Sequence, residues 1–247
     1  MLVSDSHKLV FVHVQKTGGL TVTRLLRRNV SDLHVVGARH GFAVEGMKGS
    51  EDWAEFFKFA FVRNPWDRLI SWYSMVESMQ ETRHKKQNNM WHYVHDNSST
   101  FEEFIRNCTD EVNMKRGVNY SFAYNQIDYL TDRKGRLLVD FIGRFENFEK
   151  DLREAFDRID IKLETIPRGN RSAHKHYSTY YTPETELLVR DRFKRDIEYF
   201  GYEFERPHAN QDVDVTEELS ASRKRANTAV EVAEVAEPKA PRPGSME

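Results

Sequence analysis

The chain has 247 residues, of which 39% are hydrophobic and 31% charged, and its formal net charge at pH 7 is −2. This length allows one substantial core with an appended segment, and the charge balance argues against a nucleic-acid-binding protein. The single cysteine, Cys108, excludes an intrachain disulfide and a thiolate metal cluster. No signal-peptide pattern and no apolar run approaching the ~20 residues of a membrane span is present, so we expect a cytoplasmic protein.

The first predicted element is a short, buried strand over residues 9–14, rich in β-branched side chains. Gly18 and Gly19 end this strand in a tight turn, and we expect a helix to begin near Leu20. The first N–H groups of a helix lack helical partners, and glycines there let an anion approach the main chain. The pattern is typical of a phosphate-binding loop. The candidate anion contacts are Gln15, Lys16, Thr17, Gly18, Gly19, Leu20 and Thr21.

The order of residues in this loop differs from the Walker A motif, in which a glycine comes directly before the lysine. Here Lys16 and Thr17 precede both glycines. An ordinary P-loop NTPase is therefore disfavoured. On this segment alone, an anion site and an ordinary strand–turn–helix with an exposed lysine both stay open.

A second apolar strand, over residues 57–62, runs into another predicted helix. Asn64, followed by a proline, is a good N-cap. Arg63 ends the strand with a planar guanidinium that suits a phosphate, and Ser71, two helical turns further on, could reach the same anion. In the alternative interpretation Arg63 pairs with a carboxylate such as Asp67, and Ser71 plays no part.

The rest of the chain keeps the alternation of strands and helices that is expected of a parallel sheet flanked by helices. Thr100 and Glu103 form a capping box, and Asn147 can cap a later helix. A strand is expected over residues 137–142. A last helix should open at Thr182. Its apolar face would consist of Val189, Phe193, Ile197 and Phe200.

The two strand–helix segments resemble the PAPS-dependent sulfotransferases, where PAPS is 3′-phosphoadenosine 5′-phosphosulfate. The resemblance is to the carbohydrate type, typified by the heparan sulfate 2-O- and 6-O-sulfotransferases. Residues 15–19 are similar to the family's 5′-phosphosulfate loop, and residues 62–73 to its 3′-phosphate motif. Two more blocks, 140–152 and 167–204, are similar to bacterial members, so the resemblance covers about residues 8–205.

This resemblance implies the sulfotransferase fold, an α/β structure with a P-loop-like parallel sheet flanked by helices, over residues 1–208. It also implies PAPS as the donor, PAP (3′-phosphoadenosine 5′-phosphate) as the product, and a glycan or small-molecule hydroxyl as the acceptor. Lys16 would neutralise the leaving oxygen. A sulfuryl group carries less charge than a terminal phosphoryl group, so we expect no metal. Residues 209–247 lack aromatic residues and should form a disordered tail.

The acceptor hydroxyl must lose a proton, and a histidine, with an ordinary pKa of about 6.5, suits a base near neutral pH. Of the ten histidines, His40 lies between the two phosphate motifs, where the resembling family carries its catalytic histidine. A surface-loop histidine is the alternative. His13 is expected to be a core or strand-end residue.

A loop later in the chain adds further candidates. Arg171 and Ser172 could close over the nucleotide, and His174 or His176 could serve as the base instead of His40, although a solvated loop fits as well. Two other functions stay open: a nucleotide-dependent kinase with an atypical phosphate loop, and a non-catalytic PAP-binding scaffold. The sequence carries no signal for an oligomeric state.

The long polar segment over residues 77–125 could line the acceptor side of the site. It holds a cationic cluster at residues 83–86 and the aromatic Trp91, which suit an anionic sugar or another acidic acceptor. A solvated, charged helix face is the alternative. The residues that follow, 126–130, also resemble a family segment, but the sequence assigns them no role.

Overall fold

The computed structural model describes residues 1–49, 52–79, 89–110, 122–166 and 175–206. The chain divides into two compact units, Met1–Glu205 and Arg206–Glu247, and the fold below is that of the first. The expected tail over residues 209–247 lies outside the described residues, and so do the cationic cluster at 83–86 and the loop over 167–174.

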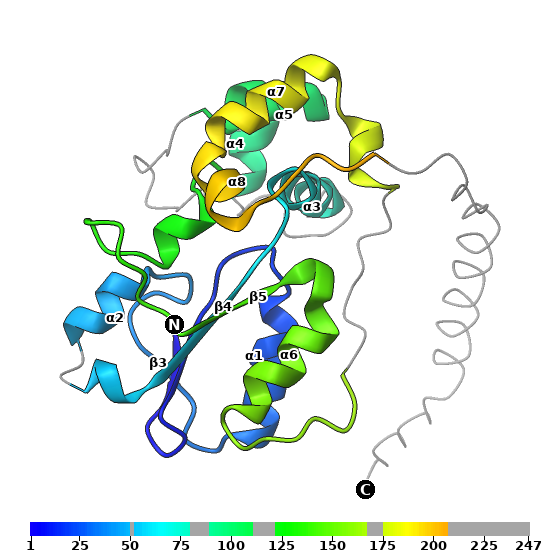
Figure 1. Cartoon of the computed structure of the whole chain (residues 1–247). Helices are drawn as coiled ribbons and strands as arrows, with labels where there is room; N and C mark the ends of the chain where they lie inside the picture. The colour runs from blue at the N-terminus through cyan, green and yellow to red at the C-terminus, as the bar shows by residue number, and fades with distance from the viewer. Residues whose placement is uncertain (50–51, 80–88, 111–121, 167–174, 207–247) are drawn as a thin grey trace, which may run out of the picture. The chain divides into compact units, whose positions relative to one another are not determined.

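A five-stranded sheet with the strand order β3-β1-β2-β4-β5 organises the first unit (Figure 1). Its strands are β1 (Leu2–Ser4), β2 (Leu9–Val12), β3 (His34–Val35), β4 (Phe57–Val62) and β5 (Phe141–Arg144). Strands β2, β4 and β5 are parallel, while β1 pairs antiparallel with β2 and β3. The α/β class with a parallel centre is confirmed, and the short strands β1 and β3 extend the sheet on the β2 side.

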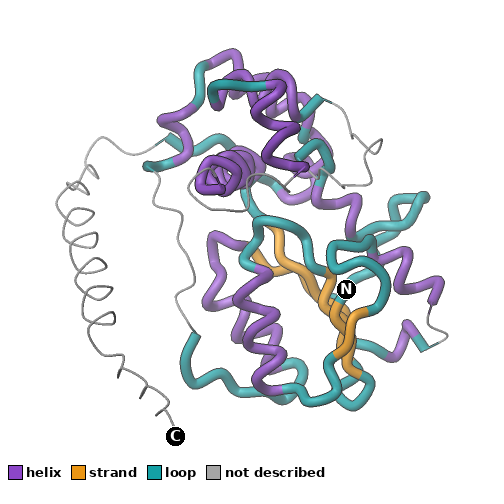
Figure 2. Tube along the Cα trace, turned by 180° about the vertical axis from the view of Figure 1, so that it is seen from behind, coloured by secondary structure: helices purple, strands orange, loops and turns teal. Residues whose placement is uncertain are grey.

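Side chains of the central strands alternate between the two faces of the sheet. One face carries Leu9, Phe11, Phe59 and Phe61, which form a buried cluster with residues of α1 (Gly19–Asn29) and α6 (Phe148–Asp157). The other face carries Val10, Val12, Ala60 and Val62. Figure 2 shows the strands from behind, with helices on either side. The second face belongs to a core that also holds residues of α2 (Ala43–Gly49), α3 (Pro65–Ser78), α4 (Asn89–Asn97), α5 (Phe101–Cys108), α7 (Pro183–Arg192) and α8 (Lys194–Phe200).

Short 3₁₀ helices connect these elements. They are η1 (Trp53–Glu55), η4 (Gln126–Tyr129), η5 (Phe145–Asn147) and η6 (Tyr177–Tyr180). The predicted N-caps of α3 and α5 are confirmed: the Asn64 side chain accepts hydrogen bonds from the N–H groups of Trp66 and Asp67, and the Thr100 hydroxyl accepts one from the N–H of Glu103. The Glu103 carboxylate accepts from the N–H of Ser99 instead of that of Thr100, so the expected capping box is incomplete. Both helices therefore begin where the sequence indicates.

Two local expectations were wrong. Asn147 occupies the N-cap position of α6 but makes no side-chain cap hydrogen bond, because its backbone is not in the extended conformation typical of a capping residue. The strand expected over residues 137–142 begins only at Phe141. Leu137 and Leu138 instead pair back with Thr131 and Leu130 in a hairpin, which draws them away from the sheet.

The single helix expected after Thr182 is two helices, α7 and α8, that meet at Phe193. The side chain of Asn125 enters the helical ladder at this point. Its Nδ2 donates to the carbonyl of Arg192 at 3.2 Å, and its Oδ1 accepts from the N–H of Asp196 at 3.1 Å. An uninterrupted helix would join these two backbone groups to each other, so the inserted amide accounts for the break.

Candidate functional site

The two predicted phosphate-binding segments lie at the same edge of the sheet. The parallel strands β2 and β4 are adjacent, with Val12 opposite Ala60, so both chains leave the sheet side by side. The two segments also touch, because Nη1 of Arg63 donates to the carbonyl of Lys16 at 3.3 Å. The carboxyl edge of parallel strands is where open α/β sheets commonly bind ligands.

The turn between β2 and α1 depends on its two glycines. Gly18 has φ 85°, a left-handed conformation, and a Cβ there would lie 2.5 Å from the ring of Phe148. A Cβ at Gly19 would lie 2.0 Å from Nε2 of His13. Lys16 also has a positive φ, 67°, which is unusual for a residue with a side chain. The loop backbone is thus packed tightly between His13 and Phe148.

The N-terminus of α1 suits an anion. Gly18 provides no side-chain cap, and no acidic residue lies in the first turn. In the described part of the chain, the first N–H groups of the helix therefore have no side-chain cap, and the helix dipole is positive at this end.

Lys16 is a half-buried cation at the mouth of this turn. Burial and, to a smaller extent, the neighbouring Arg63 guanidinium lower the pKa of Lys16 to about 8. The ammonium lies 5.6 Å from the centre of the Trp72 ring. No carboxylate forms an ion pair with Lys16 within the described part of the chain. An anion bound here would relieve the repulsion between the two cations.

Arg63 forms the ion pair with Asp67 that the sequence left open as the alternative to a phosphate contact, and it also reaches the backbone of the first segment. Its Nε donates to Oδ2 of Asp67 at 2.7 Å, and its Nη1 reaches the carbonyl of Lys16. The guanidinium carbon lies 4.1 Å from the centre of the Phe145 ring. Ser71 is buried on α3, the helix that follows Arg63.

The other loop residues have different surroundings. The Thr17 hydroxyl donates to the carbonyl of Val14 at 2.8 Å, so its backbone N–H is what Thr17 can offer an anion. Thr21 is buried, whereas Leu20 is 56% exposed. Oε1 of Gln15 is buried and has no hydrogen-bond partner among the described residues. A buried acceptor of this kind matches a ligand that carries a donor group.

His40 lies beside this loop in a defined orientation. Its Nδ1 is 3.0 Å from the carbonyl oxygen of His13. A carbonyl only accepts hydrogen bonds, so Nδ1 carries the proton and Nε2 is left with its lone pair. Burial lowers the pKa of His40, and the hydrogen bond to His13 opposes this shift. The imidazole is therefore neutral at neutral pH and able to take up a proton at Nε2.

His13 connects the base candidate with the glycine turn. It is buried at the end of β2, as expected, and stacks on Phe11. Its ring centre lies 4.4 Å from that of His40, and burial, followed by His40, lowers the pKa of His13 to about 3. Sequence reasoning did not connect His13 to the site. The available signal was its position at the end of the strand, three residues before Lys16.

Two more residues at the site were missed. Trp72 faces the Lys16 ammonium, and Phe145 faces the Arg63 guanidinium. Trp72 could have been found because it follows Ser71 directly in the second motif. Phe145 is far away in sequence, and only the parallel pairing of β4 with β5 brings it to Arg63.

Some candidates are elsewhere or lie outside the described residues. Arg171, Ser172 and His174 are not among the described residues. His176 accepts the N–H of Ser178 as the cap of η6.

Across the described ranges, no group of three or more histidine, cysteine or acidic side chains could hold a metal ion. The same ranges contain no helix with the length and apolar character required to cross a bilayer.

A sequence model of the Sulfotransferase family matches residues 1–203, so the chain belongs to this family. Carbohydrate sulfotransferase 10 of Xenopus laevis is 23% identical over 248 aligned positions, covering 82% of this chain and 67% of the relative. An uncharacterized protein of Archaeoglobus fulgidus is 27% identical over 124 positions, covering 49% of this chain and 82% of that protein. No solved structure matches significantly.

Membership of the family confirms the resemblance that was drawn from the two motifs. It also agrees with the fold, in which a parallel sheet centre is flanked by helices. The chain is therefore a transferase of the sulfotransferase type.

Proposed function

We propose that the chain transfers a sulfuryl group from PAPS to a hydroxyl of a carbohydrate or related small molecule. The observation that carries this proposal is the meeting of the two basic segments, where Arg63 contacts the carbonyl of Lys16 beside the uncapped start of α1. His40, with its Nε2 unprotonated, lies next to the same turn.

The charges of the site fit the donor. PAPS carries a 5′-phosphosulfate and a 3′-phosphate, and the site offers two cations, the half-buried Lys16 and the buried Arg63. Of these, only Arg63 has a carboxylate partner among the described residues. The loop over residues 15–21 would hold the 5′-phosphosulfate through its main chain and Lys16. Arg63 and Ser71 would hold the 3′-phosphate. Arg171 and Ser172 complete the proposed nucleotide contacts.

The chemistry follows from these positions. The acceptor oxygen attacks the sulfur in line, the bond from sulfur to the bridging oxygen breaks, and PAP leaves with the electron pair. His40 Nε2 takes the proton of the acceptor hydroxyl as that oxygen attacks. Lys16 neutralises the charge that builds on the leaving 5′-phosphate oxygen. The protein's part is mainly positioning and electrostatic stabilisation.

The acceptor class rests on a relative. The protein from Xenopus laevis is a carbohydrate sulfotransferase by name and aligns with 82% of this chain, which supports a glycan or related hydroxyl as the acceptor.

Calorimetric titration with PAP tests the donor site without knowledge of the acceptor. We expect tight binding of PAP that needs no metal and that ADP does not match, because ADP lacks the 3′-phosphate. ATP with Mg²⁺ serves as the comparison. Preference for ATP with Mg²⁺ would favour a kinase, and the absence of any nucleotide binding would remove the proposal.

His40→Ala separates a catalyst from a scaffold that only binds PAP. Sulfation of a sugar panel with radiolabelled PAPS should fall by roughly 10²–10⁴-fold, while the affinity for PAP stays unchanged. His34→Ala, which removes an exposed histidine on β3, is the matched control and should retain normal turnover. Normal turnover of the His40 variant would remove it as the base.

A further inference from the structure

Residues 126–130 resemble a family segment without an assigned role, and the structure places them behind the donor site. They form η4 and the residue after it, and η4 lies against α8. Gln126, the first residue of η4, is 0% exposed. A fully buried amide side chain requires partners for both its oxygen and its nitrogen.

The partner of Gln126 is the backbone of Arg63. Its Oε1 accepts from the N–H of Arg63 at 2.8 Å, and its Nε2 donates to the carbonyl of Arg63 at 2.7 Å. One side chain thus pairs both main-chain groups of the residue that follows the end of β4, as a neighbouring strand would. The backbone that carries the guanidinium is fixed in this way.

Asp196 on α8 holds Gln126 in turn. Its Oδ2 accepts from the backbone N–H of Gln126 at 2.8 Å and from Nε2 at 3.1 Å, and its Oδ1 accepts from Ile127 at 2.9 Å. Asp196 is 0% exposed. Its own backbone N–H is bound by Asn125, the residue that interrupts the helix between α7 and α8. At the break in the helix, Asn125 therefore positions the backbone of Asp196 so that its carboxylate meets η4.

The charge of Asp196 is compensated inside the protein. Burial raises the pKa of its carboxyl group, and the N–H groups of Gln126 and the guanidinium of Arg68 oppose this shift. Arg68 also donates from Nε to the carbonyl of Gln15 at 3.1 Å. Arg68 has its own hydrogen bonds to the carbonyls of Gln15 and Tyr124, so Asp196 acts on the donor site through Gln126 and the backbone of Arg63.

We propose that Gln126, held by Asp196, is the positioning residue that fixes Arg63 for the 3′-phosphate and so sets the preference of the site for a 3′-phosphorylated nucleotide. The inference rests on the proposed function. Neither residue touches the ligand: both act through the backbone of Arg63. The expected signature is a loss of 3′-phosphate recognition that leaves recognition of the 5′-phosphate intact.

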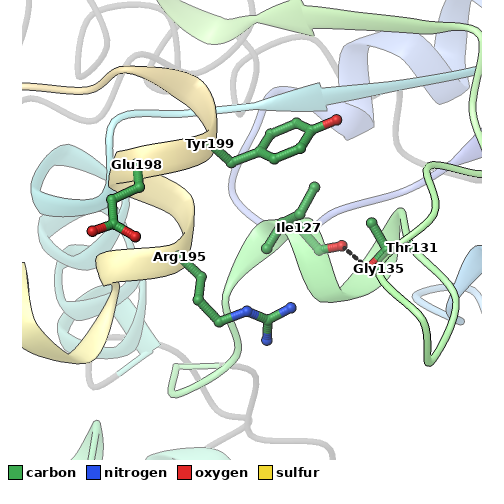
Figure 3. A pocket seen from close by; sticks show the side chains of 6 residues that line it. All are labelled: Ile127, Thr131, Gly135, Arg195, Glu198 and Tyr199. Carbon is green, nitrogen blue, oxygen red and sulfur yellow. Dashed lines mark hydrogen bonds between the residues drawn. The ribbon is translucent and has the colours of Figure 1, made fainter.

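The solvent-facing side of the contact between η4 and α8 supplies a matched control. A pocket of about 390 Å³ lies there. It is lined by Ile127, Thr131, Gly135, Arg195, Glu198 and Tyr199 (Figure 3). Glu198 is two residues from Asp196 on the same helix, but its side chain is 65% exposed and pairs with Lys194. Glu198→Gln and Asp196→Asn make the same chemical change on opposite sides of α8.

The experiment compares PAP with adenosine 5′-monophosphate (AMP), which lacks only the 3′-phosphate. In titrations of Gln126→Glu and Asp196→Asn we expect PAP to bind about tenfold more weakly, and AMP to bind as in the unchanged protein. Glu198→Gln should leave both affinities unchanged. If the unchanged protein fails to bind PAP, both the proposed function and this inference are refuted.

A double-variant cycle separates positioning from general destabilisation. When Arg63→Ala is already present, Gln126→Glu should cause no further loss of PAP affinity, because the guanidinium that it positions is absent. Equal losses with and without Arg63 would overturn the inference while the proposed function stands. An equal fall in PAP and AMP affinity would also overturn the inference. If neither Gln126→Glu nor Asp196→Asn folds, the network serves folding alone, and the inference is again overturned.

Discussion

The two strand-to-helix junctions at the carboxyl edge of the sheet are built in opposite ways. Between β2 and α1 the chain turns through Gly18, and neither a capping side chain nor an acidic residue occupies the start of the helix. Between β4 and α3, Asn64 caps the N–H groups of Trp66 and Asp67, and Asp67 adds a negative charge in the first turn. The first helix start is open to an anion, and the second is closed by the chain itself.

The contrast between the two helix starts explains how one edge of a sheet can accommodate two anionic groups. The open junction would bind one group with main-chain N–H groups, which requires close approach and hence glycines. The closed junction has its N–H groups occupied, so it would bind through a side chain, the guanidinium of Arg63. That side chain needs a fixed backbone, which Gln126 provides.

Closing the open junction should weaken PAP binding more than any other change. Gly19→Ala would place a Cβ 2.0 Å from Nε2 of His13, so either the ring or the loop must move. We expect PAP affinity to fall by roughly 100-fold or more and stability by about 1–3 kcal/mol, as for other overpacked sites. Calorimetry and urea denaturation measure the two effects.

Removal of the obstructing ring provides the control for this variant. In Gly19→Ala combined with His13→Ala, the space vacated by the imidazole accommodates the new methyl group, and most of the lost PAP affinity should return. A double variant no better than Gly19→Ala alone would show that the loop does not depend on the contact with His13.

The next effect distinguishes the two junctions by ligand. Arg63→Ala should weaken PAP by about 10–100-fold and AMP only slightly, whereas Lys16→Ala should weaken both, since each charge-assisted contact contributes roughly 1.5–3 kcal/mol. Arg24→Ala removes an equal charge from an exposed position of α1 and should change neither affinity. Identical ligand profiles for Arg63 and Lys16 would contradict the division of roles.

The pH dependence of PAP affinity reports on the open junction. The pKa of Lys16 is about 8 in the unliganded protein, and a bound anion raises it. Affinity should therefore be full below pH 8 and fall by up to about tenfold per pH unit above it, in a range where the phosphates are fully ionised. The unliganded protein should itself gain stability as the pH rises through 8, because unfolded Lys16 keeps its proton to higher pH.

Lys16→Arg is the control for this titration, because an arginine side chain stays protonated throughout the range. Its PAP affinity should be independent of pH between 8 and 10. Persistence of the slope in this variant would assign the titration to another group.

The smallest effect comes from opening the closed junction. Asn64→Ala removes the cap of α3, and we expect a loss of about 1–2 kcal/mol of unfolding free energy, measured in urea. Asn64→Ser retains an oxygen for the N–H groups of the first turn and should recover most of this loss. Equal stability of the alanine variant and the unchanged protein would show that the Asn64 cap does not stabilise this junction.

Particular elements show how far the sequence alone could predict this structure. β2, β4 and the start of α3 were predicted because buried strands, glycine turns and N-caps are local signals. β1 and β3 have three and two residues, too few to show a period, and exist through pairing with β2 and with each other. The helix that breaks at Phe193 reads as continuous, because the interrupting amide comes from Asn125, far away in the chain.

The candidate site divides in the same way. Lys16, the two glycines, Arg63 and His40 were chosen from motifs in which neighbouring residues share one task. The residues that position this set could not be chosen from the sequence. His13 contacts Gly19 and Gln126 pairs with Arg63 only after folding has brought them together.

The residue types and their order in two short segments were enough to propose which groups meet an anion and a hydroxyl, because local sequence carries that chemistry. Tertiary structure alone decided how these groups are held. The parallel pairing of β2 with β4 brings the two segments to one edge of the sheet. The His13 carbonyl sets which nitrogen of His40 carries the proton, and the buried carboxylate of Asp196 anchors the amide that fixes Arg63. Hydrogen bonds act over about 3 Å in space whatever the separation along the chain, so these partners follow from the fold and not from local sequence.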